Sequence, residues 1–397
     1  MRRLPRWVAY ASTQVNNYMT DTERLLILNM IEDVGSIRTR CLLEYFGSLS
    51  KVFEAGEDEL KRVKKIGSLI APKIVQGIRE IDLNKELKLI KRHNVKVITF
   101  IDEDYPVSLK NIYDPPVVLY VKGEILPEDD IAIAIVGSRK ASFYGMQTAE
   151  RLGYELASRG VTIVSGMARG IDSSAHRGAL KANKRTIAVL GSGLANIYPE
   201  EHIILAEEIS SKGAVISEFA METIPDRGNF PKRNRIISGL SKGVVVVEAA
   251  QKSGALITAD CALEQGKEVF AVPGKVDSVT SRGTNNLIKQ GAKLAETVDD
   301  VLEDLRLEDH PRPRVGGESR PGVGGGNLRG CGEGDNLTTA LDKTESIVYN
   351  LLSSDPQHID EVSDVTGLGI SEISKTLLNL ELRKLVKQLP GKNYVKA

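Results

Sequence analysis

The clearest candidate for chemistry is the stretch from Asp226 to Arg235, which holds four cations, one acid, one aromatic ring and two amides. Lys and Arg bind phosphates, whereas an aromatic ring stacks on an unpaired base and amides read base edges. Because duplex DNA exposes no base face, Phe230 among these cations favours a single-stranded polyanion. The alternative is a basic loop that caps a helix starting at Arg233, with Phe230 buried against that helix.

Small residues follow several predicted strands and leave room for an anion beside the backbone. Gly137 and Ser138 precede Arg139, whose planar guanidinium binds a phosphate through two hydrogen bonds. Ser253 and Gly254 stand at a predicted helix start, where backbone N–H groups point at an anion. The alternative at the first site is a turn that closes strand onto helix, with Arg139 in a surface ion pair. The G-x-G-x-x-G fingerprint is missing after the first strand, so we predict no dinucleotide cofactor.

The second predicted strand ends in small residues around Arg169, and the helix after it carries Asp172 and His176. Residues four apart share one face of a helix, so a catalytic Asp–His pair is conceivable there. A nucleophile or a metal cluster would have to accompany such a pair, and the sequence shows neither. We therefore favour a structural role for both residues, and we predict a protein that is not an enzyme and binds no metal.

Six short β-branched runs alternate with helical stretches, and they occupy residues 131–137, 161–166, 185–191, 214–218, 243–250 and 267–274. Strands buried on both faces have nearly continuous apolar sequences of this kind. The alternation predicts an α/β fold with a doubly wound, Rossmann-like parallel sheet and right-handed crossovers. Ligands bind at the carboxyl ends of such strands, so the residues that follow each strand are the candidates for a site.

Composition places the chain among ordinary globular proteins. It has 397 residues, 53 Lys and Arg against 53 Asp and Glu, and 41% hydrophobic residues. A net charge of zero still permits a local basic patch, because binding depends on local potential. The three cysteines, Cys41, Cys261 and Cys331, form neither a disulfide framework nor a metal-ligand spacing. No apolar run is long enough to span a membrane, and we expect a cytoplasmic protein.

Changes in composition predict a tail (1–20), a helical domain (21–82), the α/β domain (85–305), a flexible Gly-, Pro- and Arg-rich linker (306–336) and a winged-helix domain (337–397). In the helical domain, turns at Val34–Ser36 and Ile66–Ser68 resemble helix-hairpin-helix units, which hold a DNA phosphate. Ser replaces the usual second glycine in both turns, so a protein-contact module fits equally well. Glu372 near the start of the presumed recognition helix likewise leaves protein contact or weak backbone binding open beside sequence reading.

Taken together and in order, the motifs resemble those of the DprA (DNA-processing protein A, Smf) family. They are VGSRKASFYG, SGMARGIDSSAHRGAL, TIAVLGSGLANIYP, ISEF, NFPKRNRIISGLS, VVVVEAAQKSGALITADCALEQGKEVFAVPG and GTNNLIKQGA. They extend across residues 131–292, and the preceding YPVSLKNIYDPPVVLYVKG is also similar. Seven spaced motifs in one order are far more specific than any one of them.

The resemblance implies a cytoplasmic homodimer that binds and protects single-stranded DNA without sequence preference and delivers RecA to it during natural transformation. It implies neither a cofactor nor a membrane. Carried onto this sequence, the DNA-binding surface comprises Gly137, Ser138, Arg139, Ser165, Gly166, Arg169, Phe230, Lys232, Arg233 and Asn234. Lys184 and Arg185 beside the third strand, and Ser253 and Gly254, complete the predicted set.

The competing hypothesis is a Rossmann-like enzyme of the nucleoside-monophosphate phosphoribohydrolase type. Such enzymes resemble this chain in fold and in their glycine-rich rim, but they use a Pro-Gly-Gly-x-Gly-Thr-x-x-Glu motif. The corresponding segment, residues 251–259, lacks the glutamate of that motif. Release of free base from AMP would favour this hypothesis.

Overall fold

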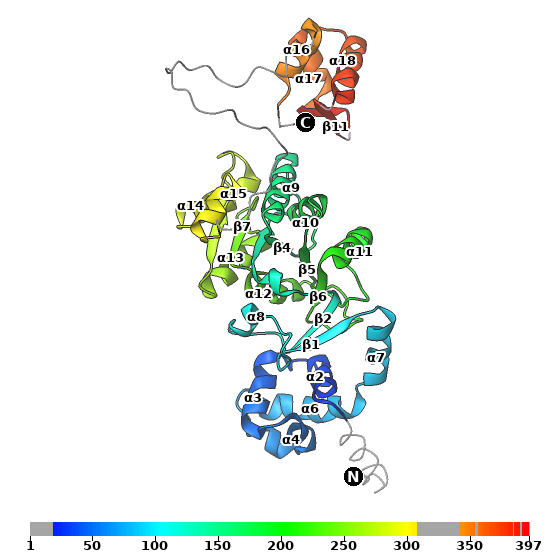
Figure 1. Cartoon of the computed structure of the whole chain (residues 1–397), viewed down its shortest axis with the longest axis vertical. Coiled ribbons are helices and arrows are strands. Elements are labelled where there is room, and N and C mark those ends of the chain that lie inside the picture. Colours follow the sequence, from blue (N-terminus) through cyan, green and yellow to red (C-terminus); the bar gives the residue numbers. More distant parts are fainter. Residues whose placement is uncertain (1–18, 308–341, 354–355, 384, 390, 397) are drawn as a thin grey trace, which may run out of the picture. The chain divides into compact units, whose positions relative to one another are not determined.

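The computed structural model describes residues 19–307, 342–353, 356–383, 385–389 and 391–396. These residues divide into two compact units, one formed almost entirely by the residues up to 307 and the other by those from 342 onward (Figure 1). All but two residues of the predicted tail, and all but two of the predicted linker, lie outside the described residues.

The first unit contains a nine-stranded sheet with the order β1-β2-β6-β5-β4-β3-β7-β8-β9. Its strands are β1 (Lys96–Thr99), β2 (Val118–Gly123), β3 (Ala132–Val136), β4 (Thr162–Ser165), β5 (Thr186–Val189), β6 (Ala214–Ser217), β7 (Gly243–Val246), β8 (Glu268–Ala271) and β9 (Lys293–Leu294). Seven neighbouring strands, β6-β5-β4-β3-β7-β8-β9 in spatial order, are parallel. The strands β1 and β2 are antiparallel and lie beside β6. The predicted Rossmann-like sheet is confirmed, and its antiparallel edge makes it mixed.

Helices cover both faces of this sheet, as the doubly wound prediction requires (Figure 1). They are α8 (Val107–Lys110), α9 (Phe143–Ser158), α10 (Ile171–Lys181), α11 (Ile203–Lys212), α12 (Asn229–Leu240), α13 (Gly254–Glu264), α14 (Arg282–Lys289) and α15 (Val298–Asp304). Ile133 and Ile135 of β3 pack with α9, α10 and α15, whereas Ala134 and Val136 pack with α12 and α13. Burial on both faces explains why the strand sequences are almost continuously apolar.

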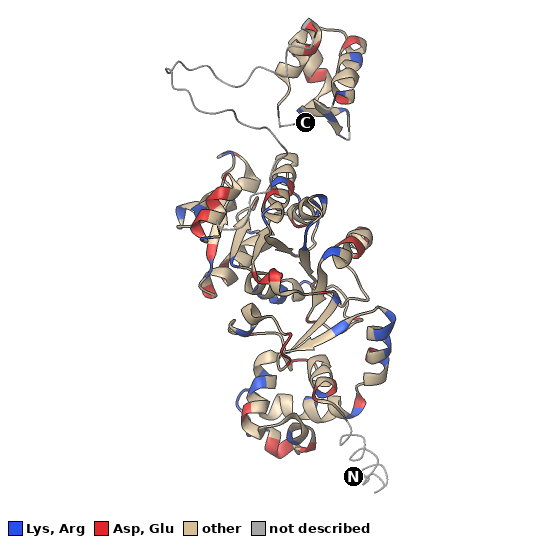
Figure 2. Ribbon diagram, viewed as in Figure 1, with Lys and Arg blue, Asp and Glu red and all other residues tan. Residues whose placement is uncertain are grey.

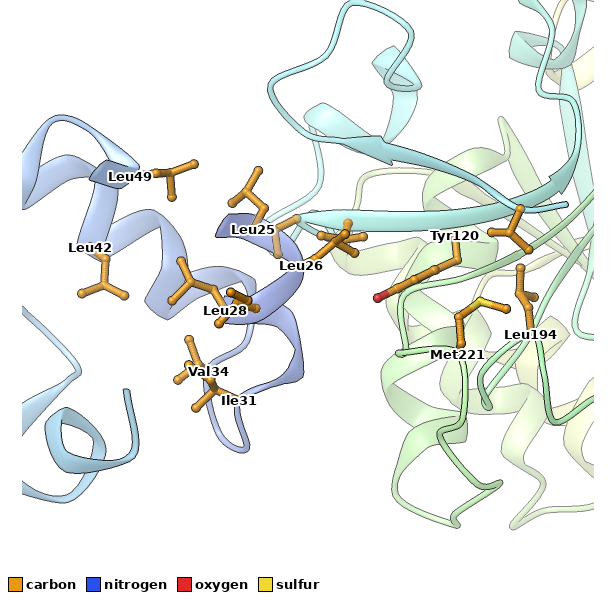
Figure 3. Close-up of a cluster of buried hydrophobic side chains, with 14 of the residues drawn as sticks. Leu25, Leu26, Leu28, Ile31, Val34, Leu42, Leu49, Tyr120, Leu194 and Met221 are labelled. Atoms are coloured by element: carbon orange, nitrogen blue, oxygen red, sulfur yellow. The ribbon is translucent and has the colours of Figure 1, made fainter. Parts of the chain in front are cut away.

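A helical segment precedes the sheet and shares a core with it. Its helices are α2 (Asp21–Met30), α3 (Ser36–Phe46), α4 (Leu49–Glu54), α5 (Glu57–Leu60), α6 (Gly67–Glu80) and α7 (Leu83–Arg92). Figure 3 shows Leu26 of α2 facing Tyr120 of β2, with Leu194 and Met221 from the strand ends beside them. Apolar burial of this kind is the main force that holds the helical segment against the sheet.

The second unit has its own small core and sheet. Its elements are α16 (Lys343–Leu351), β10 (Gln357–His358), α17 (Ile359–Thr366), α18 (Ile370–Leu382), β11 (Val386–Leu389) and β12 (Asn393–Lys396). Ile373, Leu377 and Leu380 of α18 are fully buried against α16 and α17, and β11 pairs with β12 as an antiparallel hairpin. Glu372 lies in the first turn of α18, so an acid stands where a recognition helix begins its base contacts.

Candidate nucleic-acid interface

A cleft of about 620 Å³ lies where the strand order reverses, at the carboxyl ends of β3 and β7. This reversal is the switch point at which open α/β sheets bind their ligands. The cleft is lined from the turn after β3, the first turns of α12 and the start of α13. Eight predicted residues are among its lining: Gly137, Ser138, Arg139, Phe230, Arg233, Asn234, Ser253 and Gly254.

Close backbone packing holds the turn after β3 in place. The Ser138 N–H donates to the Glu248 carbonyl at 2.6 Å, and the Ser138 carbonyl accepts from the Ile171 N–H at 3.3 Å. A Cβ on Gly137 would stand 2.9 Å from the Glu248 carbonyl oxygen, so the close approach requires glycine. Gly170 has a φ of 77°, and a Cβ there would be 2.4 Å from the Ser138 carbonyl oxygen. The turn therefore presents the exposed side chain of Arg139 from a rigid backbone.

A cation and an aromatic ring form one wall of the cleft. The guanidinium carbon of Arg139 lies 4.5 Å from the centroid of the half-buried Phe230 ring. Gly191 packs closely against this ring, since a Cβ there would be 2.7 Å from Phe230 Cδ1. A cation beside a partly exposed aromatic ring is the combination that binds the phosphates and bases of single-stranded nucleic acid.

Arg233 is in the cleft lining but is almost fully buried, with 4% of its surface exposed. Its Nη1 donates to the Val189 carbonyl, and burial lowers its pKa to about 10 although the nearby Asp172 carboxylate favours its charge. Asp172 is 6% exposed, and burial raises its pKa against the stabilising field of Arg233. The prediction placed Arg233 on the binding surface, but its guanidinium instead forms part of the cleft floor.

Ser165 and Gly166 support that floor and do not face the solvent. Ser165 is fully buried and donates to the Ile135 carbonyl at 2.6 Å. A Cβ on Gly166 would be 2.1 Å from Arg233 Nη1, so only glycine accommodates the buried guanidinium. Both residues hold the cleft from beneath, which differs from the surface role predicted for them.

Asn234 and Ser253 connect the two helices that border the cleft. Asn234 is 7% exposed, and its side-chain amide donates to the Gly254 carbonyl at 3.3 Å. The Ser253 hydroxyl accepts from the Ala255 N–H at 3.3 Å and caps α13, as serine commonly does at this position. The predicted anion cradle at this helix start is therefore occupied in part by its own cap.

Lys232 and Arg169 lie beside the cleft. The Lys232 side chain is exposed, and its charge is a minor influence on two acids: Asp33, whose pKa is lowered mainly by its hydrogen bond to Lys73, and Glu218, whose pKa is raised by burial. Arg169 is exposed and binds Glu201 through two hydrogen bonds, one of them 2.9 Å between Nη2 and Oε2. A phosphate would have to displace Glu201 to reach Arg169.

Lys184 and Arg185 lie at the amino ends of the strands, opposite the cleft, because they precede β5 and parallel strands share their direction. Arg185 Nη2 is 2.7 Å from Oδ2 of Asp129, and the same nitrogen donates to the Glu124 carbonyl at 2.7 Å. Asp129 is 6% exposed, so the pair is an internal structural contact. The predicted place of both cations beside the DNA-binding surface does not agree with this geometry.

Two cations in the cleft lining, Lys140 and Arg227, are absent from the predicted set. Both are exposed, and both stand next to residues that the sequence already singled out. The stretch from Asp226 to Arg235 is also not a loop, because α12 begins at Asn229. Helical spacing turns its last cation, Arg235, inward to ion pairs with Glu218 at 2.6 Å and Asp114 at 3.2 Å.

The Asp172–His176 pair is not a catalytic constellation. His176 is fully buried, its Nδ1 lies 2.7 Å from Thr186 Oγ1, and burial lowers its pKa to about 3. Asp172 instead accepts a hydrogen bond from the Ala168 N–H at 3.4 Å. Among the described residues, no group of three or more His, Cys, Asp and Glu side chains is placed to hold a metal ion.

In the first of the two hairpin-like turns, Val34–Ser36, a carboxylate of the protein itself lies where a phosphate would bind. The Ser36 hydroxyl at the start of α3 donates to the Asp114 carboxylate, which also receives Arg235. A phosphate at this turn would meet that carboxylate.

Lys and Arg alternate with Asp and Glu over most of the chain (Figure 2), so the cleft is distinguished by exposed cations beside an aromatic ring and not by total charge. No described helix is long and apolar enough to cross a membrane.

Comparison with known proteins identifies the family of the chain. The family model for DNA recombination-mediator protein A matches residues 96–306. The chain belongs to the DprA family. The DprA winged helix domain matches residues 335–392, which agrees with the predicted fold of the second unit.

Relatives of the DprA family match over most of their length. Protein Smf of Escherichia coli is 40% identical over 79% of this chain and 80% of its own, and protein Smf of Synechocystis is 34% identical over 93% and 97%. The crystal structure of DprA from Streptococcus pneumoniae superposes with a TM-score of 0.63 at 34% identity, and it covers 72% of this chain and 98% of its own.

Proposed function

We propose that this chain is a cytoplasmic factor that binds single-stranded DNA without sequence preference and has no enzymatic activity. The observation that carries the proposal is the Arg139 guanidinium over the Phe230 ring in the switch-point cleft. The cation binds a backbone phosphate, and the ring stacks on the adjacent unpaired base. Lys140 and Arg227 extend the phosphate-binding surface along the same cleft. Backbone and stacking contacts of this type do not distinguish one base from another.

Membership of the DprA family supports the wider biological role. We propose that the protein acts as a homodimer, protects incoming strands and loads RecA onto them during natural transformation. Sedimentation equilibrium tests whether the protein is a homodimer. The rate of RecA filament formation on strands covered by single-strand-binding protein tests RecA loading, and an unchanged rate would contradict a loading function.

The central test is titration of labelled single-stranded and duplex oligonucleotides by fluorescence anisotropy across a salt series. Arg139→Ala with Lys140→Ala should reduce the slope of log affinity against log salt by about 1.4, which is about 0.7 for each phosphate contact of a single strand. Arg177→Ala is the matched control, because this exposed arginine lies on α10 outside the cleft lining and should leave the slope unchanged.

Equal binding of the single strand and the duplex, unaffected by the cleft substitutions, would overturn the proposal. Release of free base from AMP by the wild-type protein would instead support the phosphoribohydrolase alternative. The two results are independent, so the same protein preparation distinguishes a binding factor from an enzyme.

A further inference from the structure

Tyr198 is a partly exposed aromatic residue next to the cleft wall, and neither the predicted site nor the cleft lining includes it. Its ring centroid lies 5.9 Å from that of Phe230 with an interplanar angle of 45°, and 37% of the residue is exposed. It belongs to the loop after β5, so it stands at the same edge of the sheet as the turn after β3. The ring face turned away from Phe230 has no aromatic partner among the described residues.

The backbone that follows Tyr198 is anchored, which restricts where its ring can lie. Pro199 is buried, and the Nδ1–H of buried His202 donates to the Met167 carbonyl at 2.8 Å. Met167 lies in the turn after β4, so this hydrogen bond ties the loop after β5 to the neighbouring turn. A rigid aromatic ring loses little conformational entropy when it binds a base.

Arg169 follows β4, which lies between β3 and β5 in the sheet, and it is paired with an acid. The hydrogen bonds that Arg169 makes to Glu201, together with the Glu201 charge, raise the pKa of Arg169. The side chains of Arg169 and Glu201 are 57% and 50% exposed, so solvent and a phosphate both reach the pair. The Arg169 guanidinium lowers the Glu201 pKa to about 2, so Glu201 stays ionised at neutral pH and competes with any anion.

These groups therefore lie together at the carboxyl ends of β3, β4 and β5. Arg139 lies over Phe230, Phe230 contacts Tyr198, and Arg169 is hydrogen-bonded to Glu201, three residues after Tyr198. Two neighbouring rings with a cation on either side suit a strand of alternating phosphates and bases. A solvated tyrosine without function would explain the exposure of Tyr198, but not its anchored position between these groups.

We propose that Tyr198 is a second base-stacking platform and that the strand leaves the cleft over the carboxyl ends of β4 and β5, where its phosphate displaces Glu201 from Arg169. This inference rests on the proposed binding of single-stranded DNA and adds a direction and a length to the binding track. The occupant of the platform is an unpaired base, and the occupant of Arg169 is a backbone phosphate.

The first experiment separates stacking from structural support at Tyr198. Tyr198→Leu should weaken binding of an oligothymidine by about tenfold, within the range for loss of one base stack. Tyr198→Phe should bind within twofold of the wild type. On a strand of the same length whose sugars carry no bases, both variants should match the wild type. Tyr154→Leu on α9, another exposed tyrosine, is the control and should change neither affinity.

The second experiment tests Glu201 with a change of opposite sign. Glu201→Gln should tighten binding by about two- to fivefold, the range expected when one surface ion pair no longer competes with the phosphate. Arg169→Ala should abolish that gain when combined with Glu201→Gln. Glu207→Gln, which removes the partner of Lys122 on the same stretch of chain, is the matched control and should leave binding unchanged.

These outcomes distinguish the inference from the function on which it rests. Loss of binding in Arg139→Ala, with Tyr198→Leu and Glu201→Gln both equal to the wild type, would overturn the Tyr198 track and leave the cleft function intact. A Tyr198→Leu defect that persists on the baseless strand would also overturn it, since the role would then be structural. Wild-type protein that does not prefer single strands would remove the proposed function itself.

Discussion

The two ends of the parallel strands, the carboxyl edge that carries the cleft and the amino edge opposite it, use arginine in opposite ways. At the carboxyl edge, Arg139 is exposed and lies over Phe230 in the cleft. At the amino edge, Arg185 is clamped by the buried carboxylate of Asp129 and by the Glu124 carbonyl. His176 adds to the amino edge through its contact with Thr186, the first residue of β5. One edge leaves cations available to a ligand, and the other uses them to hold the sheet together.

The difference shows that a cation buried against an internal acid stabilises the fold, whereas an exposed cation remains accessible to a ligand. Lys184 and Arg185 are one lysine and one arginine, as are Arg139 and Lys140, and both pairs adjoin a strand. The direction of the strand decides which edge each pair reaches, and the neighbouring acid decides whether its charge is already neutralised.

The largest effect is expected inside the cleft, where Arg233 stabilises the fold although it lies in the cleft lining. Arg233→Met should reduce the free energy of unfolding by about 3–5 kcal/mol, because it leaves the buried Asp172 carboxylate without its compensating charge. Urea denaturation followed by circular dichroism measures this loss.

The matched variant for this test is Arg139→Met, which removes an exposed guanidinium from the same cleft. Its stability should stay within about 0.5 kcal/mol of the wild type, as is usual for surface positions. If both variants were equally stable, the assignment of Arg233 to the cleft floor would be wrong.

The sequence predicted the sheet well because strands buried on both faces leave an unmistakable apolar pattern. Each of the six predicted runs contains one strand of the parallel sheet, including β3 within residues 131–137 and β8 within residues 267–274. The two-residue strand β9 has no such run, because it lies at an edge and is only partly buried. The antiparallel pairing of β2 with β6 is likewise a tertiary choice that no local pattern specifies.

The sequence placed a residue in the cleft where its position in the chain fixes its position in space, and misplaced a residue where side-chain direction matters. Gly137, Ser138 and Arg139 follow a strand, so they reach the cleft. Helical rotation in α12 separates Phe230, which faces the cleft, from Arg235, which turns inward to two acids. The partners that bury Arg233 and Arg235 lie far away in the sequence, so residue types alone did not reveal that these cations are internal.

At the amino edge, Arg185→Met should destabilise the protein by about 3 kcal/mol and leave the affinity for single-stranded DNA within twofold of the wild type. The loss arises because Asp129 would remain buried without its cation, and it falls at the low end for buried pairs because Arg185 keeps 18% of its side chain exposed. Denaturation and anisotropy on the same sample measure both quantities. A large loss of affinity in a folded variant would place Arg185 on the binding surface after all.

His176 should make the amino edge sensitive to acid. Its pKa is about 3 in the folded protein and near 6.5 when unfolded, so the folded state keeps it neutral. Its contribution is complete above pH 6.5 and is lost as the pH falls towards 3, because only the unfolded chain then takes up the proton. The expected loss is about 2 kcal/mol between pH 8 and pH 5, from about 1.4 kcal/mol per unit.

The variant His176→Gln isolates this contribution, since glutamine does not titrate and other groups titrate in both proteins. The difference in free energy of unfolding between the two proteins should shrink by that amount from pH 8 to pH 5, as measured by urea denaturation at each pH. Parallel pH profiles for the two proteins would contradict the neutral, buried state of His176.

The smallest effect is expected at Lys184, the exposed cation of the amino edge. Lys184→Ala should change the stability by less than about 0.5 kcal/mol, as surface substitutions usually do. It should also leave the affinity for single-stranded DNA and its salt slope unchanged, because a phosphate bound in the cleft lies at the other ends of the strands. A slope reduced by about 0.7 would show that Lys184 contacts one phosphate. The bound strand would then continue around the sheet to the amino ends of the strands.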